Sequence, residues 1–330
     1  MQMLQRYLPA GGLNFMARRR RTSRPATAAT SLHRQGYNFI APESGSSAAV
    51  KPCMWCKRAL RGGDQCYKHQ FYGIESWRCV QMTPTLRCNQ RCLFCWRSME
   101  HEITVETELS PAEIIAAIPA VQRKGLSGDK PWTDPERWET AVSQPNQYAI
   151  SLSGEPTLYS RLPELISRLR AAGNSVFVVS NGTVPEMIQQ IRPTQLYLSL
   201  DATDAESYAA LCRPVGDAAL MWECVQRSFS LLAQKEAEGI RTAARITLVK
   251  GYNDSSAAAF AAILRDARPQ YIEIKGYMYL GYSRMRLTET AVPDMQEIRS
   301  FAARLAAGLN NYTIMDENVP SRVVCLTRKP

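Results

Sequence analysis

RCNQRCLFCWR, residues 87–97, is the stretch that decides the fold class of this 330-residue chain. It places Cys88, Cys92 and Cys95 at C-x3-C-x2-C spacing on one short loop. Three thiolates at this spacing can ligate three irons of a [4Fe-4S] cluster. The fourth iron stays open because no fourth cysteine follows at ligand spacing, and an open iron can bind a small molecule through an amine and a carboxylate.

Two other uses of these cysteines fit less well. A disulfide framework would leave one of three cysteines unpaired, and nothing in the sequence indicates secretion. Structural zinc usually takes four closed ligands, whereas only one C-x2-C pair stands here and the nearest histidine is His101. The spacing, with Phe94 directly before the last cysteine, resembles the radical S-adenosylmethionine (SAM) superfamily. That resemblance implies SAM at the open iron.

From Val80 onward, short apolar segments alternate with helical patterns. Six strand–helix units predict an α/β fold with a parallel sheet and right-handed crossovers. We expect a partial (β/α)6 TIM-like barrel, with the chemistry at the carboxyl ends of the strands. Residues 124–146 break the rhythm and predict a surface insertion, and segments 313–316 and 321–326 predict two closing strands. The expected barrel strands are 81–86, 148–152, 175–180, 195–200, 242–249 and 271–275. The expected helices start at Ser110 and cover 162–172, 184–190, 221–238, 255–267 and 294–307.

Polar residues and glycine stand where these strands end. The second strand runs into Ser153-Gly154-Glu155-Pro156, which resembles the GGEP motif that binds the amino group of SAM in the superfamily. Glycine permits close backbone approach to a ligand, and proline fixes the turn that follows. On the next three strands, side chains that could hold SAM, or alternatively only cap the strand ends, are Ser180, Asn181, Ser199, Asp201 and Arg245.

A second group of cysteines precedes the barrel, in the segment 43–80. Seven of the ten cysteines lie within residues 53–95, which favours metal binding over disulfides. Cys53, Cys56, Cys66 and Cys79 could form a zinc site with C-x2-C-x9-C-x12-C spacing. Alternatively, three of them could hold a second iron–sulfur cluster. Composition alone does not decide between these sites.

The net charge of +10 is concentrated at the amino terminus. Residues 1–42 contain no Asp or Glu and are rich in Arg, Ser, Thr and Ala. This composition is typical of a mitochondrial transit peptide, so we expect a mature matrix protein that starts within about residues 25–45. A disordered basic arm that binds RNA is the alternative. No stretch approaches the ~20 apolar residues of a membrane span. The arginines of this leader are Arg6, Arg18, Arg19, Arg20, Arg21, Arg24 and Arg34.

Ten short segments between residues 50 and 328 resemble the 4-demethylwyosine synthase family, whose members act on tRNA. The segments are KPC, CYK, FYGI, RCVQMTP, CLFCWR, SLSGEP, SNGT, PTQLYLS, TLVKG and GYSRMRL. The resemblance implies a radical-SAM carbon–carbon lyase. Such an enzyme condenses N1-methylguanosine at position 37 of tRNA(Phe) with pyruvate to form the tricyclic 4-demethylwyosine. Another radical-SAM enzyme, such as an RNA modifier or a glycyl-radical activase, and a zinc-stabilised RNA-binding protein are the alternatives.

The same resemblance implies roles for individual residues. Cys53, Cys66 and Cys79 would hold a second [4Fe-4S] cluster, with Cys56 a spectator or a replacement ligand. Lys68 matches the lysine implicated in the family and could form a Schiff base with pyruvate. The open iron of the second cluster could instead chelate pyruvate.

The partners expected from the resemblance are tRNA, pyruvate and an electron donor. The flavodoxin-like domain of many eukaryotic members has no counterpart of matching length or glycine pattern here, so the chain resembles the shorter archaeal form. We therefore expect an external reductant such as a ferredoxin, and a monomer by default. Basic and aromatic residues interleave in IEIKGYMYLGYSRMRL, residues 272–287, which suits phosphates and stacked bases, although a solvated loop with packed tyrosines is the alternative. The candidate tRNA contacts are Arg97, Lys124, Lys130, Lys275, Arg284 and Arg286.

Overall fold

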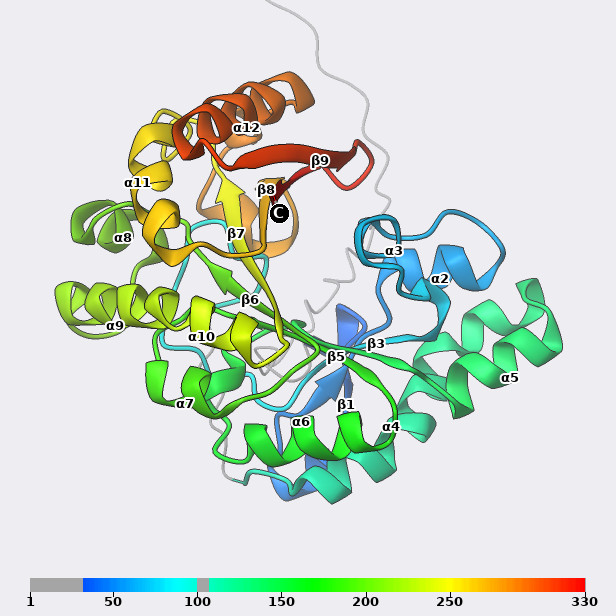
Figure 1. Ribbon diagram of the computed structural model, residues 1–330. Coiled ribbons are helices and arrows are strands. Elements are labelled where there is room, and N and C mark those ends of the chain that lie inside the picture. The colour runs from blue at the N-terminus through cyan, green and yellow to red at the C-terminus, as the bar shows by residue number, and fades with distance from the viewer. Residues whose placement is uncertain (1–31, 100–106, 330) are drawn as a thin grey trace, which may run out of the picture.

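The computed structural model describes residues 32–99 and 107–329. These residues form one ten-stranded sheet in the order β1-β2-β3-β4-β5-β6-β7-β8-β10-β9. Six neighbouring strands are parallel and follow chain order (Figure 1). They confirm the predicted partial (β/α)6 barrel. These strands are β3 (Cys79–Thr83), β4 (Gln147–Ile150), β5 (Ser175–Ser180), β6 (Gln195–Ser199), β7 (Arg241–Leu248) and β8 (Tyr271–Gly276).

Helices cover the outer face of the curved sheet (Figure 1). The first, α4, starts with the predicted capping box, in which the side chains of Ser110 and Glu113 each bond to the other residue's backbone N–H. This exchange satisfies donors that a helix start would otherwise leave unpaired. The helices are α4 (Pro111–Leu126), α5 (Pro135–Ser143), α6 (Leu162–Ala171), α7 (Pro185–Gln190), α8 (Ala205–Cys212), α9 (Ala218–Ser230), α10 (Leu232–Ala237), α11 (Ala257–Ala267) and α12 (Met295–Leu309).

Two predicted elements differ from the structure. The expected helix over 221–238 is divided into α9 and α10 at Leu231. Residues 124–146, predicted to be a surface insertion, contain the end of α4 and all of α5. Trp138 of α5 is only 4% exposed and packs against Cys56 and Leu60. The insertion therefore supports the cysteine-rich segment, a role that its polar composition concealed.

The barrel strands are buried on both faces, as parallel strands usually are. Val176, Val178 and Leu196 point outward into the core shared with the helices, whereas Phe177 and Tyr197 point inward. Successive side chains of a strand alternate between faces. The barrel interior is consequently lined by every second residue of each strand.

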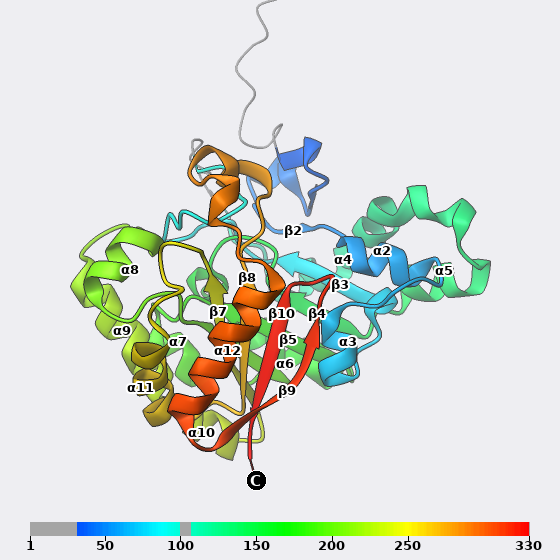
Figure 2. The ribbon, with the colours of Figure 1, turned by 90° about the horizontal axis from the view of Figure 1, so that it is seen from above.

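Strands at both edges extend the barrel. β1 (Asn38–Phe39) and β2 (Ala49–Val50) are antiparallel additions beside β3, and β10 (Val323–Arg328) and β9 (Tyr312–Asn318) are antiparallel additions beside β8. The latter pair confirms the two predicted closing strands. β9 reaches helix α3 (Tyr67–Tyr72) (Figure 2). Gln70 of α3 donates a 2.6 Å hydrogen bond to Asp316 of β9. This contact joins the cysteine-rich segment to the closing strands.

The end of the predicted leader is part of the fold. Tyr37 and Ile40 are 1% and 2% exposed, and Asn38 and Phe39 form β1. Residues 1–31, with six of the leader's seven arginines, lie outside the described residues. The leader remains a prediction, but a cleavage site that preserves these contacts must precede Leu32. None of the described helices is both long and apolar enough to cross a membrane.

Candidate active site

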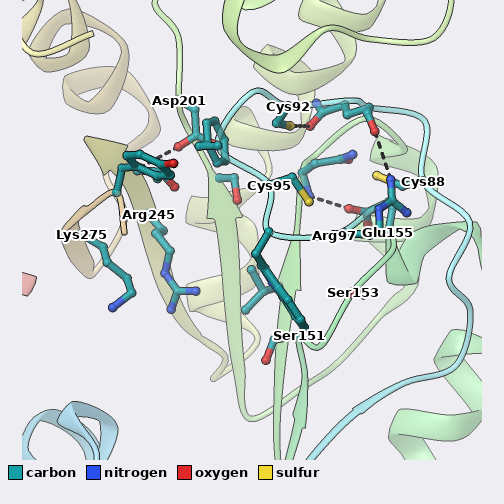
Figure 3. Close-up of a pocket in the computed structure, with 18 of the residues that line it drawn as sticks. Cys88, Cys92, Cys95, Arg97, Ser151, Ser153, Glu155, Asp201, Arg245 and Lys275 are labelled. Atoms are coloured by element: carbon teal, nitrogen blue, oxygen red, sulfur yellow. Dashed lines mark hydrogen bonds between the residues drawn. The ribbon is translucent and has the colours of Figure 1, made fainter. Parts of the chain in front are cut away.

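The loop of residues 87–98 follows β3 and is fixed by backbone hydrogen bonds with distant segments of the chain. The N–H of Leu93 donates to the carbonyl of Leu211 at 2.9 Å, and the N–H of Glu155 donates to the carbonyl of Arg87 at 2.7 Å. Cys88, Cys92 and Cys95 of this loop line a cavity of about 330 Å³ at the carboxyl ends of the strands (Figure 3). The predicted cluster ligands are thus brought together in front of a pocket.

The donor set fits a cluster better than a single ion. Within residues 32–99 and 107–329, no three Cys, His, Asp or Glu side chains converge on a single-ion position. A [4Fe-4S] cube instead takes each thiolate on a separate iron. Burial raises the pKa of Cys88 to about 12, so this thiol keeps its proton at neutral pH unless a metal displaces it. His101 lies outside the described residues.

The predicted SAM residues converge on the same cavity. Of the nine, eight line it, and the ninth, Pro156, is buried at the start of the 3-10 turn that follows. Burial raises the pKa of Asp201 to about 6, although this carboxylate accepts a 2.7 Å hydrogen bond from the N–H of Thr247. The lining residues from this prediction are Ser153, Gly154, Glu155, Ser180, Asn181, Ser199, Asp201 and Arg245.

Glu155 forms hydrogen bonds that link the end of β4 to the end of β5. Its buried carboxylate accepts hydrogen bonds from the hydroxyl groups of Thr157 (2.6 Å) and Ser180 (2.8 Å), and from the N–H of Asn181 (2.7 Å). Burial raises the pKa of Glu155, while these donors oppose the rise. Glu155 therefore sets the spacing between the end of β4 and the end of β5, which both line the cavity.

Gly154 lets the turn after β4 touch the cysteine loop. Its φ of +78° is a conformation that residues with a Cβ rarely adopt, and a Cβ there would overlap the carbonyl oxygens of Thr85 and Arg87. We expect Gly154→Ala to lower the free energy of unfolding by at least ~3 kcal/mol, because strain and overlap add. Denaturant unfolding and the iron bound per chain after anaerobic reconstitution would measure this effect.

Gly173→Ala is the matched control for this substitution. Gly173 has a similar φ of +80°, but nothing lies within 4 Å of the position that a Cβ would occupy. We expect a loss of only ~1–2 kcal/mol from backbone strain and normal iron binding. Equal effects of the two substitutions would show that the contact between the turn and the cysteine loop is unimportant.

A buried ionic network occupies the barrel interior beside the cavity. Arg245 donates to Glu273 from Nε (3.1 Å) and Nη2 (2.9 Å), and to the hydroxyl of Tyr67 (2.8 Å). Tyr72 donates to the other carboxylate oxygen of Glu273 at 2.7 Å. Glu273 was not among the residues predicted from the sequence. A signal was present, because Tyr271, Glu273 and Lys275 alternate with apolar residues along β8 and so share its inner face.

The second cysteine group also assembles at the barrel. Cys53 and Cys66 are the N-cap residues of α2 (Met54–Leu60) and α3, and Cys79 begins β3. Burial raises the pKa of Cys79, and the neighbouring Cys53 and Cys66 raise it further. The Sγ of Cys66 accepts a 3.1 Å hydrogen bond from Ser76. The thiols of the predicted trio therefore lie within electrostatic range of one another.

Cys56 is directed differently from the other three. It is fully buried, and its Sγ donates to the backbone carbonyl of Cys79 at 3.5 Å. Its neighbours include Leu60 and Trp138. Because a thiol that donates to a carbonyl keeps its proton, the geometry favours Cys56 as a spectator.

Lys68 lies on α3, within electrostatic range of Cys66 and Cys79 of the second cysteine group. Its Nζ is 5.1 Å from the centre of the Tyr197 ring and 5.4 Å from that of Phe177. Among the described residues it has no ion-pair partner. Burial lowers the pKa of Lys68, and the charge of Arg245 lowers it further. Both effects favour the neutral amine that a Schiff base requires.

The six predicted tRNA contacts lie in different environments. Three of them bond to the cysteine loop or line the cavity, and as tRNA contacts all six stay predictions. Arg97 is 8% exposed and donates to the carbonyl of Leu86, so it supports the cysteine loop. Arg286 donates to the carbonyls of Leu93, Cys95 and Arg97 in the same loop. Lys275 lines the cavity. A charged side chain near the centre of a fold bonds to the nearest backbone carbonyl or opposite charge. The composition of the surrounding segment does not reveal which partner that is.

The other three predicted contacts are exposed. Lys124 lies in the last turn of α4, and Lys130 lies in the 3-10 turn that follows it. The helix after a barrel strand runs back toward the amino ends of the strands, away from the cavity. Arg284 belongs to a 3-10 turn (Gly281–Met285) in which the N–H of Tyr282 bonds to the carbonyl of Trp96. Of the six, Arg284 alone is both exposed and close to the cysteine loop.

A partial barrel, with three cysteines and a SGEP turn around one cavity at its carboxyl end, defines the class of radical SAM enzymes. The family model for the radical SAM superfamily matches residues 82–264, and the model for wyosine base formation matches residues 266–328. The chain belongs to the family of S-adenosyl-L-methionine-dependent tRNA 4-demethylwyosine synthases.

Members of that family share most of their length with this chain. The enzyme of Pyrococcus horikoshii is 41% identical over 316 residues, which cover 92% of this chain and 89% of that protein. The Methanocaldococcus jannaschii enzyme is 37% identical and covers 84% of this chain and 90% of its own. The enzyme of Oryza sativa is 38% identical over 91% of this chain, but the match spans only 46% of that longer protein.

Two solved structures have the same fold over nearly the whole chain. The structure of TYW1 with a lysine-pyruvate adduct bound superposes with a TM-score of 0.80 at 34% identity, and covers 91% of this chain and 95% of that one. The crystal structure of archaeal TYW1 gives 0.74 at 32% identity, with 92% and 96% covered.

Proposed function

We propose that this chain condenses N1-methylguanosine at position 37 of tRNA(Phe) with pyruvate to form 4-demethylwyosine. The observation that carries this proposal is the position of Lys68. Its amine has no ion-pair partner among the described residues and lies within electrostatic range of Cys66, Cys79 and Arg245. Arg245 also lines the cavity in front of the cysteine loop. A nucleophile for a ketone and a site for SAM thus share one barrel interior.

The chemistry is divided among these groups. Cys88, Cys92 and Cys95 would hold the cluster at the cavity, and that cluster, with SAM bound, would supply the one-electron chemistry that removes hydrogen from the N-methyl group of the base. Lys68 would condense with the ketone of pyruvate, with loss of water, and position it for carbon–carbon bond formation. The bond to the carboxylate carbon would then break, so that this carbon leaves as carbon dioxide and one electron is returned. The inner wall excludes water, because Phe177 and Tyr197 are fully buried there.

A second [4Fe-4S] cluster on Cys53, Cys66 and Cys79 is part of the proposal. The three residues cap two helices and start one strand around Lys68. The N–H of Cys56 donates to the Sγ of Cys53 at 3.3 Å, a bond that stabilises a thiolate. The electron is proposed to come from a separate donor such as a ferredoxin, and the chain to act as a monomer.

The experiment that tests the function is an anaerobic assay with SAM, pyruvate, a chemical reductant and tRNA(Phe) methylated at N1 of guanosine 37. We expect 5′-deoxyadenosine and the tricyclic nucleoside, both detected by mass spectrometry after digestion of the tRNA. The same tRNA without the methyl group should give no tricyclic nucleoside. Cleavage of SAM without any tricycle from the methylated tRNA would point to another radical SAM reaction.

Arg284 is proposed to contact the tRNA backbone at the cavity rim. Its guanidinium is exposed, held by a 3.0 Å bond from Nε to the carbonyl of Tyr279 and stacked over that ring at 5.2 Å. We expect Arg284→Glu to weaken tRNA binding roughly 10-fold and to reduce the salt dependence by about one phosphate contact. Binding titrations at several salt concentrations would measure both.

Lys124→Glu changes the charge equally, but on an outer helix that runs away from the cavity. It should leave tRNA affinity within about two-fold of the wild type. If Arg284→Glu and Lys124→Glu weakened tRNA binding equally, the loss would be a general electrostatic effect and would not indicate a contact at the cavity rim.

Mitochondrial import is proposed from the composition of residues 1–42, with cleavage before Leu32. A chain that starts at Glu43 lacks the buried side chains of Leu32, Tyr37 and Ile40. We expect it to be less stable than a chain that starts at Leu32 by roughly 5 kcal/mol, measured by denaturant unfolding. Cytosolic fluorescence of a full-length fusion would contradict import, and equal stability of the two truncated chains would contradict the placement of the cut.

A further inference from the structure

Three half-buried cations surround a single buried carboxylate in the barrel interior. Arg245 and Thr247 of β7 are in register with Glu273 and Lys275 of β8, so these side chains share the inner wall. Lys68 reaches the same region from α3, where its Nζ and the guanidinium of Arg245 lie 5.1 and 4.5 Å from the centre of the Tyr197 ring. This group carries more positive than negative charge.

The carboxylate of Glu273 forms its ion pair with Arg245. It is completely buried, receives both bonds from the guanidinium, and also accepts from the hydroxyls of Tyr67 and Tyr72. The pair is therefore internally neutral. Neither Lys68 nor Lys275 forms an ion pair with any residue in 32–99 or 107–329.

Lys275 lies at the cavity wall and uses only one of its N–H donors in a hydrogen bond to the described residues. Its Nζ donates one hydrogen bond, to the backbone carbonyl of Ser321 at 2.7 Å, and lies 5.3 Å from the centre of the Tyr67 ring. A lysine ammonium has three N–H donors. Burial, followed by the charge of Arg245, lowers the pKa of Lys275 to about 8, and an enclosed cation without a counter-ion is costly. A bound anion would remove that cost.

We propose that Lys275 binds the carboxylate of the 2-oxo acid whose ketone condenses with Lys68. This inference rests on the proposed function and deepens it, because it names the group that selects the substrate. Contacts with Arg245 link the two lysines. Lys68 and Arg245 lie over the same Tyr197 ring, and Arg245 donates to the hydroxyl of Tyr67, whose ring lies 5.3 Å from the Nζ of Lys275. In a 2-oxo acid the carboxylate and the ketone are on adjacent carbons. The ammonium of Lys275 can therefore bind the carboxylate while the amine of Lys68 reacts with the ketone. A neutral ketone or ester lacks the group that Lys275 binds.

The test uses full-length, cluster-loaded enzyme under anaerobic conditions. Borohydride reduction of the Lys68–pyruvate Schiff base, followed by mass spectrometry, gives the pyruvate concentration at half-maximal trapping. We expect Lys275→Met to raise this concentration roughly 10- to 100-fold, since a charge-assisted hydrogen bond is lost. Lys275→Arg should recover most of the loss. Wild-type enzyme should prefer pyruvate over methyl pyruvate, and Lys275→Met should abolish that preference.

Lys250→Met is the matched control, because Lys250 follows the neighbouring strand β7, is exposed and pairs with Glu297 outside the cavity. It should trap pyruvate as the wild type does. Iron content and thermal unfolding are measured for every variant to establish that it is folded. If Lys275→Met does not fold, the comparison of Lys275→Arg with the wild type still tests the inference.

SAM also carries a carboxylate, and the assay separates the two ligands. If Lys275→Met raises the KM for SAM in pyruvate-free cleavage and leaves pyruvate trapping unchanged, the inference is overturned in favour of SAM. Unchanged trapping and unchanged KM overturn it as well. A wild-type enzyme that forms no adduct with pyruvate would refute the proposed function, and this inference with it.

Discussion

Lys68→Ala should abolish formation of the tricyclic nucleoside while SAM is still cleaved to 5′-deoxyadenosine. The amine is the nucleophile that would activate pyruvate, so we expect product formation to fall on the order of 10³-fold or more. SAM cleavage should persist, because Lys68 is not among the residues that line the cavity in front of the cysteine loop. Both products can be quantified from one anaerobic reaction.

Lys68→Arg separates covalent chemistry from charge. A guanidinium keeps the positive charge above the rings of Phe177 and Tyr197, but it is too weak a nucleophile to form a Schiff base. We expect this variant to be as inactive as Lys68→Ala. Substantial product from Lys68→Arg would remove the Schiff base from the mechanism and favour chelation of pyruvate by the second cluster.

The second large effect concerns the two groups of cysteines. Reconstituted wild-type enzyme should hold about eight irons per chain, and either triple substitution should lower this to about four. Replacement of Cys88, Cys92 and Cys95 by Ala should abolish SAM cleavage. Replacement of Cys53, Cys66 and Cys79 by Ala should leave SAM cleavage intact and eliminate the tricycle. Iron and sulfide quantitation, together with the two product assays, measures all of these outcomes.

Cys56→Ser provides the internal control, because the Sγ of Cys56 donates to a backbone carbonyl instead of joining the trio. It should keep all of the roughly eight irons. A loss of about four irons from Cys56→Ser would make Cys56 a ligand. About four irons in the wild type, with zinc bound besides, would replace the second cluster by the four-cysteine zinc site.

The cysteine loop was predictable because cluster ligation depends on local spacing. Cys88, Cys92 and Cys95 lie within eight consecutive positions of one loop, and a C-x3-C-x2-C loop keeps its geometry wherever it is attached. The turn from Ser153 to Pro156 was predictable for a similar reason. The trio Cys53, Cys66 and Cys79 was not separable from Cys56 by composition. Its members come together only when two helix starts and one strand pack side by side.

The basic residues were the least predictable part of the site. Arg286 was expected at the tRNA, but it donates to a carbonyl 193 residues earlier in the chain. Lys275 belongs to the same basic and aromatic segment as Arg284, yet it lines the cavity whereas Arg284 is exposed. The sequence shows how many charges a segment carries. It does not show which partner each charged side chain meets, because strand pairing and the packing of neighbouring loops decide that.

The succession of strands and helices, the cysteine loop and the turn that packs against it all follow from the amino-acid sequence alone. These features depend on hydrophobic periodicity and on ligand spacing within a few residues. The meeting of Arg245, Glu273 and Lys275 with Lys68 inside the barrel follows only from the folded chain. An inward position is defined by the pairing of strands and helices that are far apart in sequence, and burial and neighbouring charge then give each side chain its chemistry.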